Sequence, residues 1–275
     1  MYTESDILSS DNVKINLRFW AGKDNNLPAI VVTHGYGEHQ GYYEDFASFF
    51  QNAGYNVVTY DLRSYGRSEG KRGHVPSFDL FLDDLENVMK FTQNKYQVKK
   101  FHLFGHSLGG NIVANFLLKR SVDDVVKAVL SAPWFKLAFE PPRFKLLLAK
   151  IGNYFFPSVP VKGELKVEEL SRDENFIRRY KNDPLTYDKI SPSYFFAILE
   201  AGQYALKHAN ELKVPVLILH GDGDKVTSVQ ASKEFCDKAG DMCTFKLWTG
   251  GYRHVIFSEK DKNKVFEYIE EFLNP

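Results

Sequence analysis

The sequence predicts an α/β fold, in which a mostly parallel central sheet is flanked by helices and carries one helical insertion. Short, largely apolar runs alternate along the chain with longer segments that have apolar residues at i, i+3 and i+4. Such runs are typical of strands buried on both faces, as in a parallel sheet between two helical layers. The alternation breaks once, between residues 132 and 214, in a stretch too long for a bare loop.

The predicted strands are spaced so that a helix fits between most of them. The first alternates apolar and polar residues and is expected to be half exposed. In order, the strands are 13–19, 29–32, 56–60, 101–104, 127–130, 214–219 and 244–248. The helices are 42–53, 78–96, 109–119, 229–239 and 261–273. We assign the interruption, 134–190, to a helical cap, and the ranges 1–133 and 191–275 to the core.

Charge and cysteine content limit the possible partners and compartments. The 275 residues include 35 Lys and Arg against 35 Asp and Glu, so the net charge is zero and we expect no nucleic-acid partner. The acidic N-terminus lacks the apolar segment of a signal peptide, and no apolar stretch approaches the ~18 residues that span a bilayer. Cys236 and Cys243 have no second pair, so we expect reduced thiols in a cytoplasmic protein whose membrane contact, where it occurs, is peripheral.

Residues 105–109 have the pattern G-x-S-x-G, with Ser107 at the centre. The pattern directly follows the strand 101–104 and runs into the helix 109–119, which is the context of a sharp strand-to-helix turn. Glycines on either side of the serine let neighbouring backbone approach closely. Such a turn presents the hydroxyl at the carboxyl ends of the strands, where α/β sheets bind ligands, so Ser107 is the candidate nucleophile.

A serine hydroxyl needs a base that takes its proton, and histidine is the usual one. In α/β folds that transfer acyl groups the base follows the serine in the chain, so His208, His220 and His254 are the candidates. We expect His208 on a polar helix face and His220 packed at a strand end. His254 lies in a glycine-rich loop after the strand 244–248, where it would reach the same edge of the sheet as Ser107.

The base in turn needs an acid that holds the imidazole in one tautomer and stabilises its charged form. Asp222 and Asp224 both lie just past the strand 214–219, and spacing alone does not choose between them. The aspartate that is not used would be a turn residue.

Two backbone amides are expected to bind the oxyanion of an acyl-transfer reaction. One is the amide of Leu108, at the start of a helix, and the other is that of Tyr36, in a loop with two glycines after the strand 29–32.

We expect no metal, because no carboxylate or thiolate cluster completes a site around the neighbouring histidines. We expect no nucleotide cofactor, because the glycine patterns that bind nucleotide phosphates are absent.

Further motifs extend over nearly the whole chain. They are HGYGEH at 34–39, DLRSYGRSEG at 61–70, RGHVPSF at 72–78, LSRD at 170–173 and YKNDPL at 180–185. With the serine turn, they resemble the monoacylglycerol lipase and lysophospholipase family of the α/β-hydrolases. The family usually has glycine where this chain has Ser64. That departure lies outside the catalytic set, and we expect it to alter a turn, because serine adopts positive φ poorly.

The resemblance implies a role for each candidate. The family's acid follows the pattern H-G-x-x-D, which selects Asp224. Its nucleophile and base correspond to Ser107 and His254, and its oxyanion amides correspond to Tyr36 and Leu108. The implied reaction is hydrolysis of carboxylic esters of single-chain lipids, monoacylglycerols first, through an acyl-enzyme.

Alternatives to this function stay open. They are a lysophospholipase, a carboxylesterase for short-chain esters and, more distantly, a non-catalytic binding protein on the same fold. The role of the stretch 144–156 is also open. Its apolar residues either pack on the core or line an acyl tunnel in a mobile cap that also touches membranes. These apolar residues follow one another at near-helical spacing and are Leu147, Leu148, Ile151, Tyr154 and Phe155.

Overall fold

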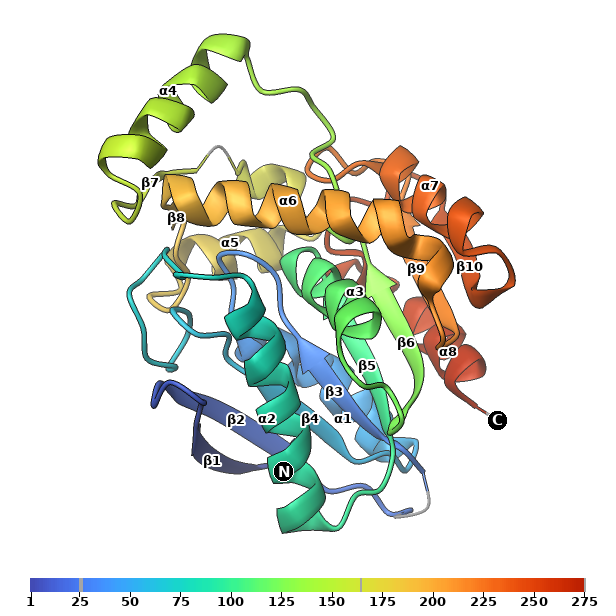
Figure 1. Cartoon of the computed structure of the whole chain (residues 1–275). Coiled ribbons are helices and arrows are strands. Elements are labelled where there is room, and N and C mark those ends of the chain that lie inside the picture. The colour runs from blue at the N-terminus through green and yellow to red at the C-terminus, as the bar shows by residue number, and fades with distance from the viewer. Residues whose placement is uncertain (25–26, 164, 275) are drawn as a thin grey trace.

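The computed structural model describes residues 1–24, 27–163 and 165–274. Strands and helices alternate along most of this chain (Figure 1). The strands are β1 (Thr3–Leu8), β2 (Lys14–Trp20), β3 (Ala29–Thr33), β4 (Val57–Tyr60), β5 (Phe101–His106), β6 (Val125–Ser131), β7 (Val161–Lys162), β8 (Lys189–Ile190), β9 (Val216–Gly221) and β10 (Cys243–Trp248). The α-helices are α1 (Glu44–Asn52), α2 (Asp79–Tyr96), α3 (Leu108–Lys119), α4 (Arg143–Phe155), α5 (Glu174–Asn182), α6 (Pro192–His208), α7 (Val229–Ala239) and α8 (Lys262–Leu273).

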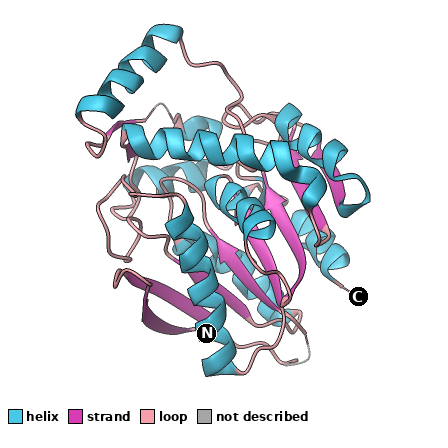
Figure 2. Cartoon of the chain, viewed as in Figure 1, coloured by secondary structure: helices cyan, strands magenta, loops and turns pink. Residues whose placement is uncertain are grey.

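One large sheet has the strand order β1-β2-β4-β3-β5-β6-β9-β10. Neighbouring strands are parallel from β4 to β10, whereas β1 and β2 extend one edge in antiparallel pairing. Helices cover both faces of the sheet (Figure 2), and every residue of β3, β4, β5 and β9 is buried. The predicted α/β class with a mostly parallel sheet is therefore confirmed.

Most predicted elements lie within a few residues of the observed ones, but β1, β7 and β8 were not predicted, and α6 was expected only as a helix around His208. In β1 only Ile7 is buried, where it faces Ile15 of β2, so the strand carries almost no apolar periodicity. The exposed edge strand is instead held by backbone pairing with its neighbour, which local sequence does not encode.

The expectation that the strand 13–19 is half exposed is wrong, because every residue of β2 after the first is buried and the polar Asn16 and Arg18 are held by hydrogen bonds to Ser68 and Glu44.

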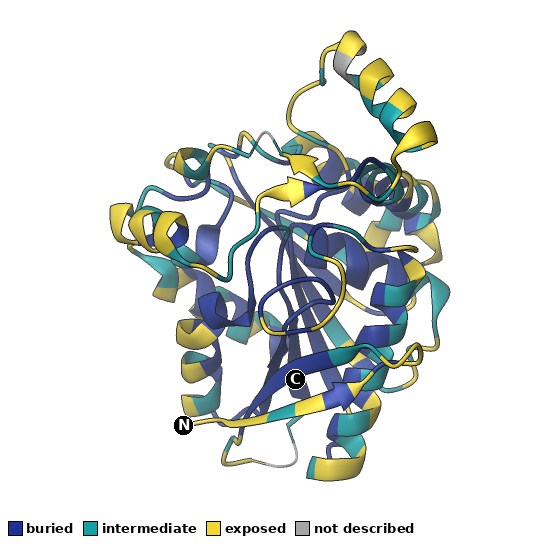
Figure 3. Cartoon of the chain, turned by 90° about the vertical axis from the view of Figure 1, so that its left-hand side faces the viewer, coloured by how far each residue is buried: buried dark blue, intermediate teal, exposed yellow. Residues whose placement is uncertain are grey.

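The segment 134–190 contains α4, α5 and a two-stranded ribbon of β7 and β8. In Figure 1, α4 stands off from the body of the molecule, and Figure 3 shows most of it exposed. The interpretation that its apolar face packs on the core is wrong. The five side chains expected there are 47% to 81% exposed, because the helix has no layer of the core within reach on that side.

Ser64 has a φ of 73°, in the left-handed region that favours glycine. Its hydroxyl donates to the His74 carbonyl at 2.9 Å, and its amide donates to the Glu69 carbonyl at 2.8 Å. These bonds hold serine in the turn conformation that glycine would adopt more easily.

The expectation of two reduced thiols is wrong. Cys236 at the end of α7 and Cys243 at the start of β10 form a disulfide, with their Cα atoms 4.9 Å apart. The chain reverses between them at Gly240, whose φ is 60°, and this turn brings the two cysteines together. The argument from free thiols to a cytoplasmic protein therefore fails. Separately, no helix in the described ranges combines the length and apolarity that crossing a bilayer requires.

Candidate active site

A cavity of about 430 Å³ lies at the carboxyl ends of the central strands. Its walls come from the loops that follow β3, β5, β6, β9 and β10, together with the segment 134–190 and the start of α6. Most of the lining is apolar, as in sites for small apolar ligands. The apolar and aromatic side chains in the lining are Tyr36, Trp134, Leu137, Phe139, Pro141, Leu146, Leu148, Ala149, Val161, Leu165, Leu170, Tyr180, Ile190, Pro192, Phe195, Val226 and Val255.

Ser107 lies at one wall of this cavity, in the turn between β5 and α3. Its backbone has φ 52° and ψ −113°, a strained conformation for a residue other than glycine. The turn is held because the Ser107 amide donates to the Ser131 carbonyl at 2.9 Å and its carbonyl accepts from the Trp134 amide at 2.9 Å. A Cβ on Gly105 would lie only 2.3 Å from the Gly109 carbonyl oxygen, so the turn requires glycine there.

Asp224 is buried, and hydrogen-bond donors surround its carboxylate. Its Oδ2 lies 2.7 Å from Nδ1 of His254 and 2.9 Å from Nε2 of His220. Its Oδ1 accepts from the amides of Val226 and Thr227 at 2.7 and 3.1 Å. Burial works to raise the pKa of Asp224, but the charge of His254 and the hydrogen bonds from both histidines hold that pKa well below its usual value. Asp224 is therefore an ionised acceptor beside His254.

Asp222, the other aspartate that spacing left open, does not contact a histidine. Its carboxylate accepts from the amides of Gly250 and Gly251 at 3.1 and 2.8 Å. These bonds hold the loop that leads to His254, so Asp222 has the turn role expected of the unused aspartate.

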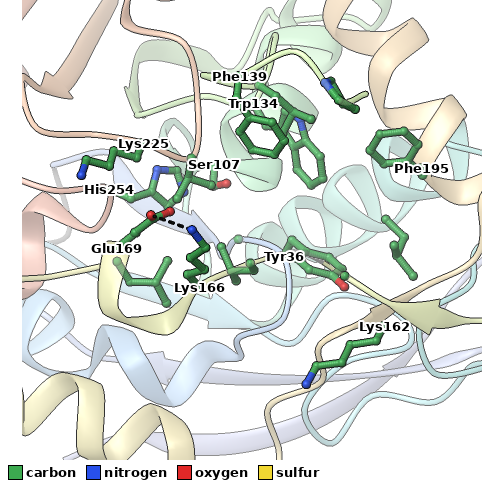
Figure 4. Close-up of a pocket in the computed structure, with 18 of the residues that line it drawn as sticks. Tyr36, Ser107, Trp134, Phe139, Lys162, Lys166, Glu169, Phe195, Lys225 and His254 are labelled. Atoms are coloured by element: carbon green, nitrogen blue, oxygen red, sulfur yellow. Dashed lines mark ion pairs between the residues drawn. The ribbon is translucent and has the colours of Figure 1, made fainter. Parts of the chain in front are cut away.

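Ser107 and His254 line the same cavity, on neighbouring loops (Figure 4). No hydrogen bond joins the Ser107 hydroxyl to the His254 ring, although both residues are in the described part of the chain. In Figure 4 the hydroxyl points away from the ring.

His106 packs against His254, with ring centroids 4.7 Å apart. Burial, and then the charge of His254, hold the pKa of His106 well below its ordinary value. Its Nδ1 lies 3.1 Å from the Ser131 carbonyl, to which it donates. A neutral His106 leaves the neighbouring ring free to take a proton without like-charge repulsion.

The loop after β3 packs directly against the serine turn. A Cβ on Gly35 would lie 3.2 Å from Cβ of Ser107, which brings the next amide, that of Tyr36, beside the turn. Within residues 1–24, 27–163 and 165–274, neither the Tyr36 amide nor the Leu108 amide donates a hydrogen bond. Both predicted amides are thus free to donate to an atom held at Ser107.

A buried carboxyl group shapes this loop. Oε1 of Glu38 accepts from the Gly35 amide at 2.6 Å and from the Tyr43 hydroxyl at 2.5 Å. Burial raises the pKa of Glu38 to about 7, against the opposing effect of these two hydrogen bonds. Glu38 therefore sets the conformation of the residue that precedes Tyr36.

Sequence reasoning expected His220 to be packed, and it is fully buried, but its contact with Asp224 was missed. The signal was present, because His220 and Asp224 are the first and last residues of the H-G-x-x-D pattern. Glu38 lies in the HGYGEH motif, and its role was also missed. In the described part of the chain, no three His, Cys, Asp or Glu side chains are grouped so as to hold a metal ion.

Comparison with known proteins places the chain among hydrolases. A monoacylglycerol lipase of Mycolicibacterium smegmatis is 28% identical over 98% of this chain and 96% of its own length. Phospholipase YtpA of Bacillus subtilis is 28% identical over 93% of this chain and 98% of its own length. An uncharacterized abhydrolase domain-containing protein of Dictyostelium discoideum is 30% identical over 98% of this chain, which spans only 28% of that protein.

The solved structures agree with the sequence relatives. The crystal structure of Paleococcus ferrophilus monoacylglycerol lipase matches with a TM-score of 0.83 and 27% identity, covering 99% of this chain and 98% of that one. This likeness shows the α/β-hydrolase fold. A family model described as serine aminopeptidase, S33, matches residues 24–261, a range that includes Ser107, Asp224 and His254. The chain therefore belongs to the family of α/β-hydrolases that this model describes. The similar proteins named above include two monoacylglycerol lipases.

Proposed function

We propose that this protein hydrolyses carboxylic esters of single-chain lipids, with monoacylglycerols as the main substrates. The observation that carries the proposal is the position of Ser107, at the wall of a largely apolar cavity and beside two unpaired amides. The relatives named as a monoacylglycerol lipase and a phospholipase support the same substrate class.

The proposed mechanism assigns one step to each group. His254 donates its Nδ1 hydrogen to Asp224, which leaves Nε2 to take the Ser107 proton as Oγ attacks the ester carbonyl. The amides of Tyr36 and Leu108 donate to the oxyanion of the tetrahedral intermediate. His254 then returns the proton to the leaving alcohol, and water hydrolyses the acyl-enzyme by the same steps.

The apolar lining favours a long acyl chain. Each buried methylene contributes ~0.8 kcal/mol, so a C14 chain gains several kcal/mol over a C4 chain after the cost of ordering it. The cap assignment of 134–190 is part of the proposal, because Leu146 and Leu148 of α4 line the cavity. Leu147 and Phe155 on the same helix are exposed, and we assign them to transient contact with the lipid surface that supplies the substrate.

Lysophospholipids are the second candidate substrates. Lys162, Lys166 and Lys225 line the cavity, and Lys166 lies 3.7 Å from Glu169 (Figure 4). Lysine is a common partner of phosphate, so these side chains suit a phosphorylated head group better than a neutral glycerol.

A rate profile on the purified protein and its Ser107→Ala variant tests the proposal. The substrates are monoacylglycerols, lysophosphatidylcholines and p-nitrophenyl esters from C2 to C16. We expect the highest kcat/KM on long-chain monoacylglycerols and a loss on the order of 10⁴-fold in the variant. Higher efficiency on short p-nitrophenyl esters would identify a general carboxylesterase, and higher efficiency on lysophosphatidylcholines would identify the second candidate. Turnover in neither protein would favour a non-catalytic binding protein.

A further inference from the structure

Two motifs of the sequence, LSRD at 170–173 and YKNDPL at 180–185, have no role in the proposed mechanism. They lie in one segment, residues 168–187, which contains α5. Figure 1 shows α5 close to the core, whereas α4 stands off from it. The segment also reaches the cavity, because Leu170 and Tyr180 line it. Its contacts therefore indicate what the two motifs do at the site.

The first part of this segment bonds to both neighbours of His254. The Val255 amide donates to the Leu170 carbonyl at 2.7 Å. The Arg253 guanidinium donates to the Ser171 carbonyl at 2.9 Å. The chain on either side of the base is therefore held by the segment.

Arg172 makes further contacts with the same loop. Its guanidinium donates to the Gly250 carbonyl at 2.6 Å and to the Glu259 carboxylate at 3.0 Å. Glu259 is only 1% exposed, and it also accepts from the Arg253 amide at 3.1 Å. Arg172 thus joins the chain before His254 to the chain after it.

The last part of the segment bonds to the loop that carries the Tyr36 amide. The carboxylate of Asp183 lies 2.9 Å from Nε2 of His39. The Tyr187 amide donates to the Gly37 carbonyl at 3.0 Å. Because Gly37 directly follows Tyr36, these bonds limit how far the loop around the oxyanion amide can move.

We propose that residues 168–187 hold the base and the oxyanion loop in place on either side of the nucleophile, with Arg172 and Asp183 as the positioning residues. This inference rests on the proposed function, because it takes His254 as the base and the Tyr36 amide as an oxyanion donor. A displacement of a catalytic group by about 1 Å costs on the order of 10²-fold in rate. A segment bonded to both loops prevents such displacements without touching the reacting atoms.

A double-mutant cycle on hydrolysis of p-nitrophenyl butyrate tests Arg172. Arg172→Met keeps an aliphatic side chain, and Glu259 keeps two backbone amides as donors, so the fold should persist. We expect kcat to fall about 10- to 100-fold, but less than about twofold in a His254→Ala background, where there is no base to misplace. Arg172→Lys, which keeps the charge beside Glu259, should recover part of the loss. An equal loss in both backgrounds would overturn the role of Arg172.

Two ketones test Asp183. Ser107 adds to the carbonyl of a decyl trifluoromethyl ketone and gives its proton to His254, so the adduct carries the oxyanion, whereas the matching methyl ketone only occupies the cavity. Asp183→Ala should weaken inhibition by the trifluoromethyl ketone about tenfold and change inhibition by the methyl ketone less than about twofold. Equal weakening of both would show that Asp183 shapes the cavity instead of the oxyanion loop, and would overturn its role.

Lys181→Ala is the matched control for both measurements. The Lys181 ammonium pairs with Glu168 inside the same segment, so its removal should change kcat and both inhibition constants less than about twofold. Failure of the proposed function gives a different pattern. A non-catalytic protein would bind both ketones equally without any substitution, whereas an esterase for short-chain esters would still show the effects of Arg172→Met and Asp183→Ala.

Discussion

The serine site and helix α4 border the same cavity but differ in how deeply their side chains are buried. Ser107, Asp224 and His254 are at most 9% exposed, and Oδ1 of Asp224 has two hydrogen-bond donors within reach and Oδ2 has three. On α4, by contrast, the apolar side chains either line the cavity or face outward. Figure 3 shows the contrast as a buried centre below a mostly exposed helix.

The difference reflects what each region is proposed to do. A reaction needs dipoles and proton donors that are already in place, because reorganising them would add to the barrier. A helix that admits a lipid must move away from the cavity and return. Such motion requires few contacts between the helix and the core, and therefore low local stability. Changes at the serine site should therefore affect the chemical step, and changes on α4 should affect how the substrate arrives.

The largest expected effect separates the two aspartates near His254. Asp224→Asn should lower kcat on the order of 10⁴-fold, because the amide no longer holds His254 in the required tautomer. Asp222→Asn is the matched control, since its single side-chain oxygen can still accept from one of the two loop amides, and it should change kcat less than about tenfold. Hydrolysis of p-nitrophenyl butyrate measures both, and circular dichroism checks that both variants fold. Equal losses would show that the loop, not the acid, limits the reaction.

The second prediction concerns the pH dependence of stability. The pKa of Glu38 is about 7 in the folded protein, above its ordinary value of 4.5, so folding favours the protonated form. Its contribution is present below pH 4.5 and is lost as the pH rises through 7. Relative to the unsubstituted protein, Glu38→Gln should therefore gain up to about 3 kcal/mol in free energy of unfolding between pH 5 and 8.

Urea unfolding at four pH values measures this gain. Glu267→Gln, at an exposed position on α8, is the control and should show no comparable trend. A difference between Glu38→Gln and the unsubstituted protein that stays constant with pH would mean that Glu38 does not titrate in this range.

The third prediction tests whether the disulfide stabilises the core alone. Cys236→Ala/Cys243→Ala should lower the free energy of unfolding by about 2.5 kcal/mol, the chain-entropy effect of a closed loop with this short separation. Reductant should produce a similar loss in the unsubstituted protein. Limited proteolysis within α4 should be unchanged, because the disulfide joins α7 to β10, whereas α4 has its main contacts with α6. Two free thiols by mass spectrometry in non-reduced protein would contradict the assignment.

The smallest expected effect lies on α4. Leu147→Ser/Phe155→Ser should raise the apparent KM for emulsified monoacylglycerol about tenfold, because two apolar side chains no longer partition into the lipid surface. Hydrolysis of dissolved p-nitrophenyl butyrate should change less than about twofold, since neither residue lines the cavity. Leu8→Ser, which changes an exposed leucine on β1, is the control. A large loss on the dissolved ester would show that α4 shapes the reaction site itself.

Local sequence was sufficient to name most residues of the candidate site. The serine turn depends on residues within one strand, one turn and one helix, so Ser107 and the Leu108 amide were predicted from adjacent residues. His254 was predicted from its glycine-rich loop after a strand. Spacing did not choose between Asp222 and Asp224, because both follow the same strand by a few residues; the resemblance selected Asp224, and its 2.7 Å contact with His254 agrees.

Other features depended on contacts between distant parts of the chain. The bond between Cys236 and Cys243 depends on a tight chain reversal between α7 and β10. The exposure of the apolar face of α4 depends on whether another helix or strand packs against that face. The contacts of Arg172 and Asp183 with the two loops that carry catalytic groups join parts of the chain that are far apart in the sequence. Periodicity and turn residues determine where strands, helices and turns form, because these depend on neighbouring residues. Only packing in three dimensions decides which side chains meet and which donors stay unpaired.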